Sequence, residues 1–108
     1  MENKFNVTIM DDVLEFIGTL LIKQQNKILG AINILGNKKF DEIYVKHLSD
    51  KIKELKVGKY RLIFFIHKDE AVFVSAFIKK SNKTPKLEIE LALKFYQSFI
   101  KFNQNKNI

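Results

Sequence analysis

The sequence has 108 residues, 46% of them hydrophobic, which is enough for one compact domain and too few for two. It contains no cysteine, which excludes a disulfide framework, a thiolate nucleophile and a cysteine-bound zinc ion. No apolar run approaches the ~20 residues that a membrane-spanning helix needs, and the first residues have no signal-peptide pattern. We therefore expect one domain over residues 1–108, a cytoplasmic location and no membrane partner.

The formal net charge of +7 is concentrated in the second half of the chain. Residues 1–44 contain five lysines and six acidic residues, a net charge of −1. Residues 45–108 contain thirteen lysines and one arginine against six acidic residues, a net charge of +8. An excess of this kind indicates a polyanionic partner. Compositional drift is the alternative, and it explains the number of lysines better than their uneven distribution.

The first part of the chain predicts one strand followed by helices. Phe5–Ile9 alternates apolar and polar residues, which is typical of a strand. Asp11–Asp12 offers a helix N-cap, and Glu15 completes a pattern that resembles a capping box. Apolar residues then recur at helical spacing until Gly36–Asn37, a C-terminal stop signal. Gly18 and the lysine- and glutamine-rich segment after it indicate two helices, or one that bends.

The second part predicts a sheet and a final helix. Lys38–Asp50 is interpreted as a polar connection, and three strands follow at Ile52–Val57, Tyr60–His67 and Ala71–Ile78. Tight turns between them predict an antiparallel meander. A helix over residues 85–102 has an apolar face wider than one small sheet covers, so neighbouring elements or a partner must cover it. The predicted class is α+β in the order β-α-α-β-β-β-α, with an N-terminal helical hairpin, a small, mostly antiparallel sheet and a C-terminal helix.

A lysine-rich segment, residues 77–90, connects the last strand to the last helix. Thr84 and Pro85 are typical of a helix start, because the hydroxyl can cap the helix and proline fits its first turn. The lysines of this segment are Lys79, Lys80, Lys83 and Lys86. A helix N-terminus is already positive, so these lysines repel one another and the dipole, and a phosphate would relieve the repulsion. A solvated loop is the alternative.

Arg61 is the only arginine in the chain. Strand periodicity places its side chain on the same face as those of Ile63, Phe65 and His67. A guanidinium can bind phosphate through two parallel hydrogen bonds, which lysine cannot do. The alternative is an ion pair with a carboxylate at the edge of the core, such as that of Glu54. The pattern alone leaves both open.

Several classes of chemistry are disfavoured by spacing. His47 and His67 are twenty residues apart with no partner at a metal-ligand spacing. The acidic pairs lie at predicted caps and turns, and the serines and glycines form no nucleophile elbow or phosphate-binding loop. Cationic phosphate chemistry remains. RNA supplies its own nucleophile, the 2′-hydroxyl, and clustered lysines can stabilise charge and accept a proton.

Three segments resemble the HigB branch of the RelE/ParE superfamily, which comprises toxins of bacterial toxin–antitoxin pairs and includes phage-derived members. These segments are Asp-Val-Leu-Glu-Phe-Ile at 12–17, the block formed by Tyr-Val-Lys-His-Leu at 44–48 with Glu-Leu-Lys at 54–56 and Tyr-Arg-Leu at 60–62, and Phe-Ile-Lys-Lys-Ser-Asn-Lys-Thr-Pro-Lys-Leu-Glu-Ile at 77–89. The last is similar to the most specific motif of that branch. Lys56 departs from the pattern, because many relatives have arginine there.

The resemblance implies a RelE-like fold and an endoribonuclease without metal or cofactor, which enters the ribosomal A site and cleaves mRNA through 2′-hydroxyl attack. It implies catalytic roles for Arg61, Lys80, Lys83 and Lys79, and RNA-binding roles for Lys46, His47, Lys56 and Lys86. It also implies a HigA-like helix-turn-helix antitoxin as partner, with operator DNA bound only through the antitoxin complex. Two alternatives stay open: a ParE-like toxin that inhibits gyrase, and a non-catalytic binding protein derived from a prophage.

Overall fold

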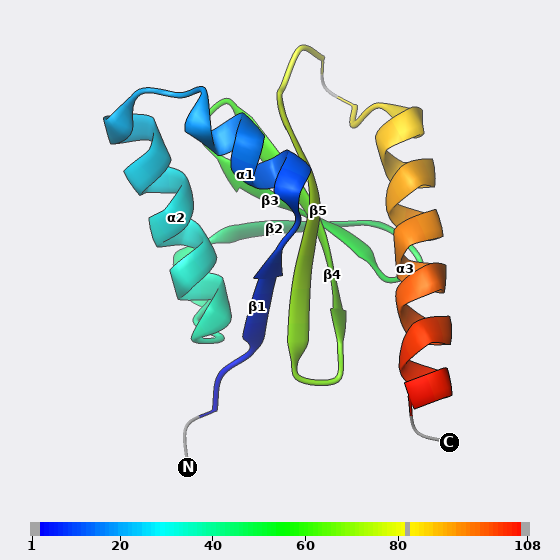
Figure 1. Cartoon of the computed structure of the whole chain (residues 1–108). Coiled ribbons are helices and arrows are strands. Elements are labelled where there is room, and N and C mark those ends of the chain that lie inside the picture. Colours follow the sequence, from blue (N-terminus) through cyan, green and yellow to red (C-terminus); the bar gives the residue numbers. More distant parts are fainter. Residues whose placement is uncertain (1–2, 82, 107–108) are drawn as a thin grey trace.

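The computed structural model describes residues 3–81 and 83–106 and contains a five-stranded sheet with helices on both faces (Figure 1). The strands are β1 (Asn6–Ile9), β2 (Tyr44–Ser49), β3 (Ile52–Val57), β4 (Tyr60–His67) and β5 (Glu70–Ile78). The helices are α1 (Asp11–Gly18), α2 (Ile22–Gly36) and α3 (Lys86–Lys106), and a short 3₁₀ helix, η1 (Phe40–Glu42), precedes β2. The predicted α+β class is confirmed.

The strands follow one another across the sheet in the order β1-β5-β4-β3-β2. The predicted antiparallel meander is confirmed for β3, β4 and β5. β1 pairs in parallel with β5, with Val7 opposite Ala71, so the first strand lies beside the last one. β4 is in the middle of the sheet, and its first six residues are buried.

The interpretation of Lys38–Asp50 as a polar connection is wrong over its second half. Tyr44–Ser49 forms β2, an edge strand antiparallel to β3. An edge strand buries little, and three of its six residues are exposed. Its polar residues are therefore those of an edge exposed to solvent. The missed strand supplies part of the site described below.

Two helices in the first half are confirmed, but their ends differ from the prediction. α1 ends at Gly18, and residues 19–21 connect it to α2. The polar segment that follows this connection is the beginning of α2. The expected cap and capping box at α1 are wrong, because Met10 occupies the N-cap position and makes no side-chain hydrogen bond to the helix. Asp11 and Asp12 lie in the first turn instead, where their negative charges interact favourably with the positive end of the helix dipole.

The two faces of the sheet form two hydrophobic clusters. Leu62 and Phe64 belong to the cluster under α1 and α2, and Ile63 and Phe65 belong to the cluster under α3. The ring of His67 lies against that of Phe99 in α3, with 5.8 Å between the centroids. The predicted common face of Ile63, Phe65 and His67 is thereby confirmed. Because α3 covers only one end of this face, the beginning of β4 is left open on the same side.

α3 is longer than predicted, and its apolar face is only partly covered. Leu93, Tyr96 and Phe99 pack on the sheet, while Leu87, Leu91, Phe95 and Phe102 are exposed. The predicted polar stripe is exposed as well, and it consists of Glu90, Lys94, Gln97 and Lys101. The expected polar tail begins inside α3, and its last two residues lie outside the described part of the chain. No helix in the described ranges combines the length and apolar character needed to span a membrane.

Candidate functional site

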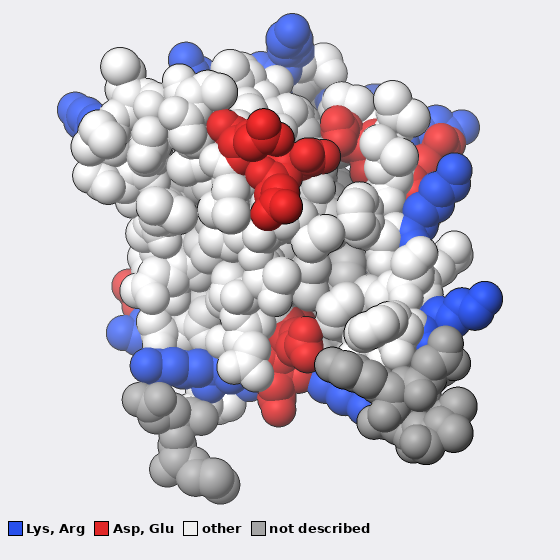
Figure 2. Space-filling model, in the orientation of Figure 1, with Lys and Arg blue, Asp and Glu red and all other residues white. Residues whose placement is uncertain are grey.

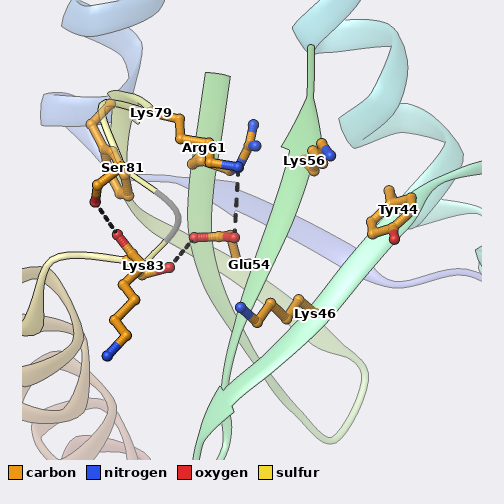
Figure 3. Close-up of a pocket in the computed structure, with 10 residues that line it drawn as sticks. Tyr44, Lys46, Glu54, Lys56, Arg61, Lys79, Ser81 and Lys83 are labelled. Carbon is orange, nitrogen blue, oxygen red and sulfur yellow. Dashed lines mark hydrogen bonds and ion pairs between the residues drawn. The ribbon is translucent and has the colours of Figure 1, made fainter. Parts of the chain in front are cut away.

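A pocket of about 200 Å³ lies where β2, β3 and β4 meet the connection between β5 and α3 (Figure 3). Its lining residues are Tyr44, Lys46, Glu54, Lys56, Arg61, Phe77, Lys79, Ser81, Lys83 and Thr84. Five of these side chains are basic and one is a carboxylate. The pocket therefore concentrates positive charge at the end of the sheet that α3 leaves open.

The strand register explains how the sheet builds the floor of this pocket. Tyr44 pairs with Lys56, Lys56 with Arg61, and Arg61 with Phe77. Residues that are directly opposite across a sheet project from the same face. One row across four strands therefore brings an aromatic ring, a lysine, an arginine and a second aromatic ring to the same side.

The Arg61 guanidinium is held by its own surroundings while it lines the pocket. The residue is 5% exposed. Its Nη1 donates to the carbonyl oxygens of Gly58 at 2.8 Å and Tyr60 at 2.9 Å, and its Nε lies 3.7 Å from Oε1 of Glu54. The two alternatives left open by the sequence therefore coexist, since the arginine faces the pocket and also pairs with Glu54.

Glu54 contacts the lysine-rich connection as well as Arg61. Its Oε2 accepts a hydrogen bond of 2.5 Å from the Thr84 hydroxyl. The prediction that the Thr84 hydroxyl caps the helix is therefore wrong, because this hydroxyl donates to Glu54 in β3 instead. Pro85 directly precedes α3, one residue before the predicted first helical position, and its carbonyl oxygen accepts from the N–H groups of Glu88 and Ile89.

The pocket lysines come from two parts of the chain. Lys46 and Lys56 project from β2 and β3, whereas Lys79 and Lys83 belong to the connection before α3. The Nζ of Lys56 lies 5.0 Å from the centroid of the Tyr44 ring. Within the described part of the connection, the Ser81 hydroxyl donates to the Lys83 carbonyl oxygen at 3.0 Å, and Figure 3 shows both residues beside the sheet.

Three of the predicted site residues do not line the pocket. Lys80 is exposed on the connection, and Lys86 is exposed in α3 with its Nζ 4.0 Å from a carboxylate oxygen of Glu90. His47 follows Lys46 in β2 and therefore projects from the opposite face. Its Nε2 lies 2.6 Å from the carbonyl oxygen of Asp50 in the adjoining turn. Asn82, part of the motif that resembles the HigB branch, lies outside the described residues.

Sequence reasoning missed the contribution of Tyr44 to the site and saw Glu54 only as a possible partner for Arg61. Tyr44 is 66% exposed at the pocket, with Nζ of Lys56 over its ring. Reading residues 44–49 as a strand would have placed Tyr44 and Lys46 on one face by period-2 alternation. No sequence signal pointed to the bond between Glu54 and Thr84, because it depends on how the connection folds back over β3.

The fold is that of RelE. A crystal structure of the archaeal RelE–RelB complex from Pyrococcus horikoshii OT3 matches with a TM-score of 0.63 and 16% sequence identity, over 69% of this chain and 94% of the matched chain. The family described as "Phage derived protein Gp49-like (DUF891)" matches residues 15–97, and the chain belongs to this family. The expected RelE-like fold is thereby confirmed, and the family agrees with the resemblance to phage-derived proteins. Among curated proteins no match was found.

Proposed function

We propose that this protein is the toxin of a toxin–antitoxin pair and that it cleaves mRNA in the pocket around Arg61. The observation that carries the proposal is the gathering of five basic side chains, with an exposed tyrosine at the rim, in one pocket of a RelE-like fold. Phosphate backbones attract such clusters, and exposed aromatic rings stack with unpaired bases. The family and the fold support the same reading.

In the proposed reaction, the 2′-oxygen of the RNA attacks the adjacent phosphorus, and the bond from phosphorus to the 5′-oxygen breaks. A neutral basic side chain of the pocket takes the 2′-hydroxyl proton, and a protonated lysine of the pocket gives a proton to the departing 5′-oxygen, which yields a 2′,3′-cyclic phosphate and a 5′-hydroxyl. Arg61 stabilises the charge that builds on the non-bridging oxygens. Lys79 and Lys83 neutralise the phosphate from the opposite side, and no metal or cofactor takes part.

The neighbouring residues have supporting roles in this proposal. Lys46 and Lys56 bind the RNA backbone, and Tyr44 stacks on a base next to the cleaved bond. Lys80 and Lys86 lie outside the pocket, where they can contact more distant phosphates. The substrate is mRNA in the ribosomal A site, the location is the cytoplasm, and the antitoxin is a HigA-like helix-turn-helix protein that carries the complex to operator DNA. The matched RelE was crystallised with RelB, which supports an antitoxin partner.

The first prediction concerns Arg61→Ala. Induction of the wild-type protein should arrest growth and create new 5′ ends inside translated frames, whereas Arg61→Ala should do neither, because the transition-state charge loses its guanidinium. Purified wild-type protein that has been treated with EDTA and then freed of the chelator should still cleave mRNA on programmed ribosomes. The measurements are growth curves, mapping of 5′ ends and cleavage assays with treated and untreated protein.

Lys94→Ala is a suitable control, since Lys94 is exposed on α3 and does not line the pocket. Circular dichroism and antitoxin binding establish that Arg61→Ala is folded. Full toxicity of a folded Arg61→Ala protein would contradict the role of Arg61, and loss of cleavage by the EDTA-treated protein would restore a metal mechanism. Growth arrest with intact mRNA would instead favour gyrase inhibition.

A further inference from the structure

Among the described residues that line the pocket, Glu54 is the only carboxylate, and it is 6% exposed. Its Oε1 lies 3.7 Å from Nε of Arg61, and its Oε2 accepts from the Thr84 hydroxyl. A carboxylate only accepts hydrogen bonds, so one side chain can hold two donors that come from different parts of the chain. In Figure 3 dashed lines join Glu54 to Arg61 and to the connection that carries Lys83.

The connection that carries Lys79 and Lys83 is tied to the sheet near both of its ends. At its start, the N–H of Lys79 donates to the carbonyl oxygen of Lys59 at 2.8 Å. At its end, Thr84 is tied to β3 through Glu54. Lys80, Ser81 and Lys83, the described residues between these points, are exposed, and the Ser81 bond to Lys83 lies within the connection. The Thr84 bond therefore sets where Lys83 stands relative to Arg61.

We infer that Glu54 is a positioning residue, which couples the lysine-rich connection to Arg61 through the chain Thr84–Glu54–Arg61. It holds Thr84 and orients the guanidinium, so that the strand arginine and the loop lysines face the same phosphate. The catalytic consequence rests on the proposed function; the coupling itself does not. Glu54 does not act as the proton acceptor, because both of its oxygens already face donors of the protein.

Arg61 provides a direct spectroscopic test in the free protein. As the only arginine in the chain, it gives a single Nε–H resonance in a ¹⁵N-labelled sample. Thr84→Val removes the hydroxyl but keeps the size of the side chain. We expect this variant to shift the Arg61 Nε–H resonance and to speed its hydrogen exchange about tenfold, as the loss of a hydrogen bond to a charged group allows. Thr84→Ser should restore the wild-type resonance.

Ser75→Ala provides a matched control. The Ser75 hydroxyl donates to a carboxylate oxygen of Glu88 at 2.6 Å, so this bond also ties the sheet to α3 but lies outside the pocket. Ser75→Ala should leave the Arg61 resonance in place. An unshifted resonance in a folded Thr84→Val protein would overturn the coupling, and so would an equal shift in Ser75→Ala.

Single-turnover cleavage with saturating programmed ribosomes then tests whether this coupling affects the rate of catalysis. Thr84→Val should lower the cleavage rate by tenfold or more while the affinity for the ribosome changes little, because the loop cations are misplaced rather than removed. Thr84→Ser should recover the rate. A cleavage rate abolished in Glu54→Gln and unchanged in Thr84→Val would make Glu54 the proton acceptor and overturn the inference. If wild-type protein cleaves no RNA, the proposed function fails, and the resonance still decides whether the coupling exists.

Discussion

At the scale of single residues, the burial of Arg61 shows how one side chain can serve both structure and site. Its Nη1 is occupied by two backbone carbonyls and its Nε faces Glu54, so the guanidinium enters the pocket in a fixed orientation. The sequence identified this arginine because it is unique and begins a strand. The sequence could not rank phosphate binding against pairing with Glu54, because that depends on the register between β3 and β4.

Tyr44 permits a prediction at this scale. Because its side chain is largely exposed, replacing it should not disturb the core. Tyr44→Ala should weaken binding to single-stranded RNA about tenfold or more, since stacking of a base on an aromatic ring contributes about 1–3 kcal/mol. Fluorescence anisotropy with a labelled oligonucleotide measures the change in dissociation constant.

The stacking role distinguishes the ring from the hydroxyl. Tyr44→Phe keeps the ring and should bind nearly as well as the wild type, and Phe102→Ala, which removes an exposed ring on α3, should bind normally. Equal losses for Tyr44→Phe and Tyr44→Ala would point to the hydroxyl and against stacking.

At the scale of elements, the segments with strong periodicity matched the structure and the exposed ones did not. β3 and β4 have the predicted ends because their apolar residues are buried in the sheet. β2 was missed because an edge strand can keep polar residues, and the cap of α1 was misplaced because Met10 takes that position without a side-chain bond. The course of the connection after β5 depends on a tertiary contact, the Thr84–Glu54 bond, which no local pattern encodes.

Replacing glycine by alanine should have opposite effects on stability in α2 and in the turn between β3 and β4. Gly30 lies within α2 with open space where a Cβ would be, so Gly30→Ala should raise the free energy of unfolding by about 0.5–1 kcal/mol. Gly58, in the turn between β3 and β4, has a φ of 57°, so Gly58→Ala should lower it by about 1–2 kcal/mol. Urea unfolding of both variants measures these changes.

Gly58→Asn serves as the control for the turn, because asparagine tolerates positive φ better than alanine. It should be less destabilising than Gly58→Ala. If alanine and asparagine are equally harmful at this position, the backbone conformation is not the cause of the loss.

At the scale of the whole molecule, the charges are separated. Figure 2 shows a face on which acidic side chains gather over α1, where Asp11 and Asp12 form the first turn, while basic side chains lie mainly along its margins. The pocket collects five cations from β2, β3, β4 and the connection after β5. The uneven net charge of the two halves of the sequence predicted this separation. Which lysines line the same pocket is visible only in the folded structure.

The charge separation predicts the salt dependence of RNA binding. Each phosphate neutralised on a single strand contributes a slope of about −0.7 to the logarithm of the binding constant against the logarithm of salt concentration. Lys79→Gln and Lys83→Gln should each make the slope shallower by about 0.7. Lys23→Gln, on the exposed side of α2, should leave the slope unchanged. Titrations at several salt concentrations measure it, and equal slopes for all three variants would show that the pocket lysines do not contact phosphate.

The pairing of β1 with β5 has a consequence for the timing of synthesis. The first strand leaves the ribosome early, yet its partner in the sheet is the last strand of the chain. The pocket needs Lys83 and Thr84, which follow that last strand. An unfinished nascent chain therefore has neither the closed sheet nor the assembled cations. The pocket can therefore assemble only after β5 and the connection that follows it have been synthesised, however early the first strand emerges.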